Sequence, residues 1–346
     1  MADFCFCPDL SPAEDRQSRD LVSLMLFRIP GLRTAERSRL SMKFSSIAEL
    51  AGFSKKDIEA LIQRSISENW TMDEVRALAE KDYITAERQG IGMVTLNDIE
   101  YPPLVREIYD PPAILFYRGI LPNPEKPLAA MVGTRQPTPA AASCAYRLGR
   151  DLGSYGIPVV SGLALGIDAF SHRGNVDAGA PAIAVLGSGL DQIYPSSNRP
   201  LAGRIIDNGG VLISEYPPEM GPRKWHFPAR NRIISALARG TIIVEAPEKS
   251  GALITADFAI EQGRDLWVTM DGVRSYRGKG TAALAAEGAK VIDSAREILA
   301  EWGLSKYNAV SPKDPEYTAW ILQKDRELNT GLSLAVSIAE TLGLEI

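Results

Sequence analysis

From residue 128 to about residue 305, the chain repeats one pattern: a short apolar run followed by a segment long enough for a helix. Continuous apolar runs of this kind are typical of strands that are buried on both faces of a parallel sheet. Right-handed helical crossovers then cover both faces, which predicts an α/β fold with a doubly wound, mostly parallel sheet. The predicted strands are residues 128–132, 158–160, 182–186, 211–213, 241–244, 266–269 and 290–292.

The remaining segments differ from this region. Residues 11 to about 90 are polar and helical in period, with a tight Ile29-Pro-Gly-Leu32 turn, which predicts a small all-α unit of the SAM-like or helix-hairpin-helix kind. Arg33 stands where a DNA-binding hairpin needs a second glycine, so an ordinary helical packing domain is the alternative. A proline-rich segment with one expected strand, residues 113–117, follows. We therefore expect a helical domain (1–90), a linker with a lead-in strand (91–125), a Rossmann-like domain (126–305) and a C-terminal tail of unassigned fold (306–346).

Charge and cysteine content exclude several classes of protein. The chain has 38 Lys and Arg against 43 Asp and Glu, a net charge of −5, so any nucleic-acid site must be a local basic patch. Cys5, Cys7 and Cys144 make no disulfide framework, and no second pair completes a metal site beside Cys5 and Cys7. The sequence has neither an unbroken apolar run of about 18 residues nor a secretion signal. We expect no metal, no membrane partner and a cytoplasmic location.

Turns rich in glycine and serine follow four of the predicted strands. In a doubly wound sheet, ligands bind at the carboxyl ends of the strands, where backbone N–H groups at helix N-termini can hold phosphate. For a single turn, the simpler explanation is that glycine permits a tight turn, but four such turns on one edge favour a phosphate-binding crevice. The candidate contacts in these turns are Arg135, Ser161, Gly162, Gly187, Ser250 and Gly251.

Neither a nucleotide cofactor nor catalysis is indicated. The dinucleotide pattern G-x-G-x-x-G is absent after the first strand, and the P-loop pattern is absent altogether. The two histidines are His172 and His226, and Asp168, four residues before His172, is better explained as a helix-capping residue. No serine lies in a G-x-S-x-G elbow. We expect a binding protein with no cofactor and no catalytic residue.

A basic and aromatic run covers residues 223–232. It contains four positive charges, Trp225 and Phe227, and no acidic residue. Cations neutralise phosphates and aromatic rings stack on unpaired bases, so this composition suits single-stranded nucleic acid. The alternative is a solvated basic loop that opens a helix. The candidate residues are Arg223, Lys224, Phe227, Arg230, Asn231 and Arg232.

Taken in order, the motifs between residues 97 and 300 resemble those of the DNA-processing protein A (DprA/Smf) family. Each motif is weak by itself, whereas the ordered series is specific. The series includes Val132-Gly-Thr-Arg135, Val160-Ser-Gly-Leu-Ala-Leu-Gly-Ile-Asp168, His226-Phe-Pro-Ala-Arg-Asn-Arg232 and Ser250-Gly-Ala-Leu-Ile-Thr-Ala256.

The resemblance implies a protein that binds single-stranded DNA in a positive pocket, dimerises through the Rossmann-like domain and helps load a RecA-type recombinase in natural transformation. It implies a pocket built from Arg135, Arg223, Lys224, Phe227, Arg230 and Arg232 and lined by Ser161 and Gly162. Two departures stand out: Ala282 replaces an asparagine of the family pattern, although Arg277 and Lys279 add charge nearby, and no winged-helix module is evident after residue 305.

The alternative is an enzyme on the same fold, a phosphoribohydrolase that acts on nucleoside monophosphates. Those enzymes carry a P-G-G-x-G-T-x-x-E pattern, and the corresponding stretch here, residues 248–255, lacks the acid at that spacing.

Overall fold

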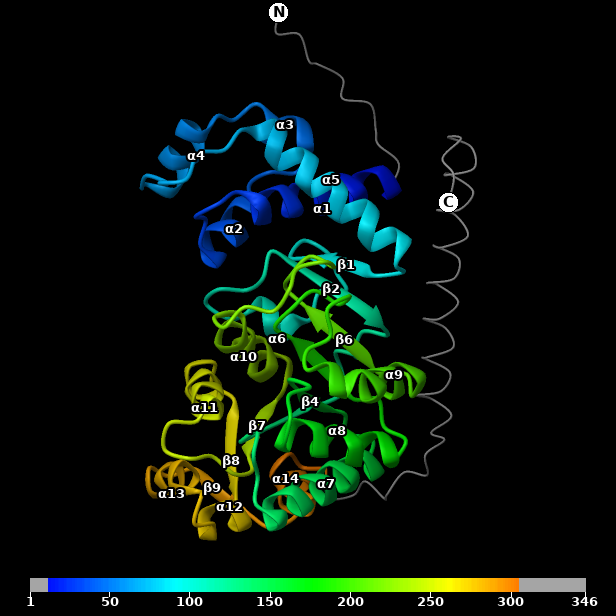
Figure 1. The fold of residues 1–346 in the computed structure, drawn as a ribbon, viewed down its shortest axis with the longest axis vertical. Coiled ribbons are helices and arrows are strands. Elements are labelled where there is room, and N and C mark those ends of the chain that lie inside the picture. The colour runs from blue at the N-terminus through cyan, green and yellow to red at the C-terminus, as the bar shows by residue number, and fades with distance from the viewer. Residues whose placement is uncertain (1–11, 305–346) are drawn as a thin grey trace, which may run out of the picture.

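The computed structural model describes residues 12–304, and all seven predicted strands form one parallel array within its central sheet (Figure 1). The array follows the order β6-β5-β4-β3-β7-β8-β9. Because the order runs outward in both directions from β3 and β7, the sheet is doubly wound, and its switch point lies between these two strands. The bounds are β3 (Ala129–Val132), β4 (Val159–Ser161), β5 (Ile183–Leu186), β6 (Val211–Ser214), β7 (Gly240–Ile243), β8 (Asp265–Thr269) and β9 (Lys290–Ile292).

Helices cover both faces of this array. One hydrophobic cluster joins the sheet to α10, α11 and α13, and another joins it to α7 and α14. The predicted parallel α/β architecture is therefore confirmed. The bounds are α7 (Pro139–Ser154), α8 (Ile167–Asp177), η1 (Ser196–Asn198), α9 (Arg199–Asp207), α10 (His226–Leu237), α11 (Gly251–Glu261), α12 (Met270–Arg274), α13 (Lys279–Ala286) and α14 (Ala295–Glu301).

Two antiparallel strands extend the sheet beyond β6. The expected lead-in strand forms as β2 (Ile114–Gly119), which pairs with β6 on one side and with β1 (Gly92–Thr95) on the other. β1 has only four residues and begins with a glycine, so it does not stand out as a strand in the sequence. The segment 91–125, with the short helix α6 (Pro103–Arg106), thus contributes a sheet edge where a linker was expected.

The N-terminal part is all-α, as the helical period predicts, and in Figure 1 it lies over the β1–β2 edge. Its helices are α1 (Pro12–Arg28), α2 (Thr34–Ser41), α3 (Ile47–Ala51), α4 (Lys55–Ile62) and α5 (Met72–Arg88). Ser54 and Thr71 begin α4 and α5 with reciprocal capping boxes. The apolar side chains of this unit, such as Leu24, share one core with Phe116 of β2.

The tail 306–346 and the Cys5–Cys7 pair lie outside the described residues. Among residues 12–304, no helix combines the length and the apolarity needed to cross a bilayer.

Candidate nucleic-acid interface

The basic and aromatic run meets the first glycine turn at the carboxyl edge of the sheet. The guanidinium carbon of Arg135, which follows β3, lies 5.4 Å from the centroid of the Phe227 ring in the first turn of α10. The Tyr194 ring lies 5.7 Å from the same ring. We call Arg135, Tyr194, Phe227 and the exposed residues Arg223, Lys224 and Trp225 the Phe227 surface. The two features that the sequence predicted to share one edge therefore lie in contact.

The outer part of the Phe227 surface is exposed to solvent. Trp225 is 65% exposed, and the guanidinium carbon of Arg223 lies 5.6 Å from its ring centroid. A guanidinium at this distance from an aromatic face is held by a cation–π interaction. The surface thus presents cations beside aromatic rings, an arrangement suited to phosphates and unstacked bases.

Gly187, at the end of β5, makes room for the Phe227 ring. A Cβ atom at this position would lie 2.9 Å from Cδ1 of Phe227, closer than carbon atoms pack. The position of the Phe227 ring therefore requires a glycine at residue 187. Gly187 shapes the surface by leaving space for that ring.

Replacing Gly187 by alanine is accordingly expected to displace the Phe227 ring and to weaken binding of single-stranded oligonucleotides about three- to tenfold, part of the 1–3 kcal/mol that a stacked base contributes. Fluorescence anisotropy with a labelled oligonucleotide measures this effect. Gly203→Ala is the matched control, because a Cβ there meets nothing within 4 Å. Equal affinities of the two variants would show that the ring position does not matter.

Arg230, which the sequence placed among the DNA contacts, lies buried beneath the Phe227 surface. The side chain is buried, and its Nη1 donates to the carbonyl of Gly162 at 2.7 Å and to that of Val185. Burial lowers the pKa of Arg230 to about 10, while Asp168 acts in the opposite direction. The guanidinium thus joins the ends of β4 and β5 and occupies the space where a residue larger than Gly162 would clash.

Arg232 belongs to an internal ion pair, which removes it from the predicted interface. Its Nη1 and Nη2 atoms each donate to Glu215 at 2.9 Å, and its Nε donates to Asp110 at 3.1 Å. Both Arg232 and Glu215 are buried. Residues two apart on a helix lie on different faces, so Arg230 and Arg232 cannot both face the same ligand. The charged residues among 223–232 are therefore all basic in the sequence, but in the folded protein their side chains point to different places.

The turn after β4 is stabilised internally. The Ser161 hydroxyl is buried and donates to the Met131 carbonyl at 2.7 Å, so it ties β4 to β3 and does not line a surface. The Asp168 carboxylate accepts from the Gly162 N–H at 3.1 Å. Asp168 thus holds the turn after β4 through backbone amides, but it does not cap α8 as expected, because Gly166 is the N-cap and no side chain caps that helix. Burial lowers the pKa of His172 to about 3, which leaves that ring neutral.

Asn231, Ser250 and Gly251 gather at the same edge, between α10 and α11. The Asn231 side-chain amide donates to the Gly251 carbonyl at 3.2 Å, and the Ser250 hydroxyl caps α11 by accepting from the Ala252 N–H at 3.2 Å. Asn231 and Ser250 are half-buried and Gly251 is exposed.

Sequence reasoning missed a chain of stacked rings at the start of α10. The ring of His226 stacks on Tyr216 with centroids 3.8 Å apart, and Tyr216 in turn meets Phe27 of α1 edge-on at 6.4 Å. These contacts link the helical unit to the start of α10. Tyr194 was also missed as a surface ring, because only the fold brings the segment after β5 next to Phe227.

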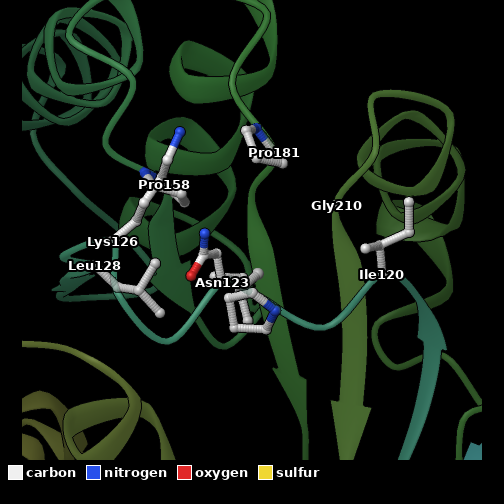
Figure 2. A pocket seen from close by; sticks show the side chains of 9 residues that line it. Ile120, Asn123, Lys126, Leu128, Pro158, Pro181 and Gly210 are labelled. Atoms are coloured by element: carbon white, nitrogen blue, oxygen red, sulfur yellow. The ribbon is translucent and has the colours of Figure 1, made fainter. Parts of the chain in front are cut away.

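Other possible sites in the described part of the chain are weak. Over residues 12–304, no three His, Cys, Asp or Glu side chains gather as a metal site would require. A recess at the amino edge of the sheet, lined by Pro158, Pro181 and Gly210, holds only about 10 Å³ (Figure 2). That volume accommodates about one water molecule.

The fold and the surface together define a class: Rossmann-like proteins that bind a ligand at the carboxyl edge of a doubly wound sheet. Within this class, the chain belongs to the DNA recombination-mediator protein A family, whose model matches residues 92–303.

Known relatives agree with this placement. The chain is 37% identical over 262 residues to DNA processing protein DprA of Bacillus subtilis, covering 71% of this chain and 87% of that protein. It is 39% identical over 220 residues to the Streptococcus pneumoniae DprA, covering 64% and 77% respectively. These matches support a role in DNA processing and recombination, and they do not favour the phosphoribohydrolase alternative.

Solved structures show the same fold. The crystal structure of the Streptococcus pneumoniae DprA matches with a TM-score of 0.62 at 30% identity, covering 84% of this chain and 96% of that one. A DNA processing protein A from Helicobacter pylori, described for its single-stranded DNA binding mode, matches with a TM-score of 0.55 at 32% identity, covering 62% and 97%.

Proposed function

We propose that this protein binds single-stranded DNA on the Phe227 surface and acts as a recombination mediator that loads a RecA-type recombinase, as in natural transformation, without altering the DNA. The observation that carries the proposal is the Arg135 guanidinium held 5.4 Å from the Phe227 ring at the carboxyl edge of the sheet. Family membership and the single-stranded DNA binding of the Helicobacter pylori relative support it.

The charge distribution favours a local polyanion site. Across residues 12–304, the structure records no ion pair between a carboxylate and Arg135, Arg223 or Lys224. These three exposed cations remain available for phosphates in a chain whose net charge is −5. Each phosphate contact on a single strand releases counterions. The logarithm of the binding constant should therefore fall linearly with the logarithm of the salt concentration.

Replacing Arg135 by alanine is expected to weaken binding of single-stranded oligonucleotides at least about fourfold near 0.15 M salt and to reduce the log–log salt slope by about 0.7, the contribution of one phosphate contact. The loss should be equal for different base sequences, since phosphate contacts carry no sequence information. Arg204→Ala on α9 is the matched control, because Arg204 pairs with Asp177 and is 49% exposed. An unchanged salt slope in the Arg135 variant would remove Arg135 from the interface.

Dimer formation, recombinase loading and the absence of catalysis are each tested by a separate measurement. Light scattering of the full chain tests for the homodimer that we expect to form through the Rossmann-like domain. Assembly of a RecA-type recombinase on single-stranded DNA, with the parent chain and with the Arg135 variant, tests loading. Recovery of intact oligonucleotide after incubation, and of intact AMP without free base, tests the absence of catalysis.

A further inference from the structure

A second recess lies beside the Phe227 surface, at the switch point of the sheet. It is a cleft of about 390 Å³ between the segments that follow β3, β7 and β8. We call it the switch-point cleft. Its walls are Thr134, Gln136, Pro247, Glu248, Lys249, Tyr276, Arg277 and Lys279. The sequence pointed only to Arg277 and Lys279 among these, as charge near the predicted pocket and not as DNA contacts.

Topology makes this the expected ligand position in such a fold. Open α/β sheets bind ligands outside the carboxyl ends of the two strands from which the order reverses, here β3 and β7. The Phe227 surface lies to one side of that point, where Phe227 packs over Gly187 at the end of β5. The Phe227 surface therefore reaches the switch point only through Arg135, which follows β3.

The switch-point cleft is positively charged. Lys249, Arg277 and Lys279 line it and are exposed, against the single carboxylate of Glu248. Over the described range 12–304, none of the three cations forms an ion pair with a carboxylate. The buried Arg232, by contrast, is paired with Glu215 inside the protein. The charge in the cleft is available to an external anion.

The walls of the cleft are held in place before any ligand arrives. Arg277 donates from Nη1 to the Gln136 carbonyl at 2.9 Å, which joins the loop after β8 to the loop after β3. At the start of α13, the N–H groups of Gly280 and Thr281 donate to the Ala246 carbonyl. Those two amides are therefore already used, and the positive charge offered to an anion comes from the side chains of Lys249, Arg277 and Lys279.

The cleft also offers an aromatic ring. Tyr276 is 80% exposed, and the guanidinium carbon of Arg277 lies 5.7 Å from its ring centroid. A ring beside lysine ammonium groups matches a nucleotide, which presents a phosphate and a planar base close together.

We propose that the switch-point cleft is a second nucleotide-binding site, in which Lys249 and Lys279 bind a phosphate and Tyr276 stacks on the base. The nucleotide is either part of the DNA strand that crosses the Phe227 surface or a free nucleotide from solution. The first of these two sources rests on the proposed function. Both sources share the same chemistry.

The test compares the parent full-length chain with a Lys249→Ala/Lys279→Ala variant. Arg277 is kept because it holds the cleft walls together. Affinity is measured by anisotropy with oligothymidylates of about 4 to about 16 nucleotides, and thymidine monophosphate is titrated by calorimetry. Arg204→Ala is again the control, and Tyr276→Ala tests the ring.

For a strand that reaches the cleft, the double variant should bind long oligonucleotides about tenfold more weakly near 0.15 M salt, with a slope reduced by about 1.4, two contacts of about 0.7 each. Short oligonucleotides should bind unchanged. For a free nucleotide, the variant should lose binding of thymidine monophosphate while all oligonucleotides bind as before.

Two results would overturn the second site: equal binding of every probe by the parent and the variant, or an equal loss for short and long oligonucleotides, which a general charge effect produces. Failure of the parent chain to bind short oligonucleotides would instead reject the Phe227 surface, and the nucleotide titration alone would then decide on the cleft.

Discussion

Replacing Arg232 by alanine is expected to lower the free energy of unfolding by about 3–5 kcal/mol, because it leaves a buried carboxylate without its partner. Glu215 is 5% exposed and accepts from both terminal nitrogens of Arg232 at 2.9 Å. Burial by itself lowers the pKa of Arg232, but Glu215 and Asp110 together raise it above its ordinary value, as expected for a guanidinium held by two carboxylates.

The ion pair has this effect because it joins three distant segments. Asp110 follows α6, Glu215 follows β6, and Arg232 lies within α10. Losing the arginine should loosen the start of α10 together with the lead-in segment. DNA binding should then fall because less of the protein is folded. The salt slope of binding by the folded protein should not change.

Urea unfolding followed by circular dichroism measures the loss of stability. An Arg232→Met/Glu215→Leu double variant should recover most of the stability, since apolar residues often replace a buried pair at little cost. Arg135→Ala is the control on the surface and should stay within about 0.5 kcal/mol of the parent. A loss below about 1 kcal/mol for Arg232→Ala would mean that water reaches Glu215 and that the pair is not buried in solution.

Replacing Phe227 by alanine is expected to weaken binding of single-stranded oligonucleotides about 5- to 150-fold, equivalent to about 1–3 kcal/mol for a lost stacking platform. The ring is half-buried between Gly187 and Arg135, with Tyr194 beside it. Its removal takes away the stacking face and leaves the Arg135 guanidinium without its support, whereas the cations themselves remain.

Because no charge is lost, the salt slope should hardly change, and this separates Phe227→Ala from Arg135→Ala. Phe227→Trp should retain binding, since it keeps an aromatic face. Phe170→Ala is a matched control: Phe170 also lies under an arginine, with the Arg173 guanidinium carbon 5.5 Å from its ring centroid, but it belongs to α8. Equal losses for Phe170→Ala and Phe227→Ala would show that the effect comes from folding and not from stacking.

The sequence by itself determined the architecture of the central domain. Each of its strands is a short apolar run and each crossover is a helix-length segment, and this periodicity is local, so the doubly wound sheet and its glycine-rich edge could be predicted. The strand β1 escaped prediction because Gly92–Thr95 gains its burial from pairing with β2, a contact that no local pattern encodes.

Only the tertiary structure decided which basic side chains reach solvent. Residues 223–232 look uniformly cationic in sequence, yet α10 begins at His226, so its helical turn directs Arg230 under the glycine turns and Arg232 towards Glu215. Arg135 and Phe227 are distant in sequence and meet because β3 ends and α10 begins at the same edge of the sheet. Burial and charge pairing depend on what packs against a residue from elsewhere in the chain, and that information exists only once the chain has folded.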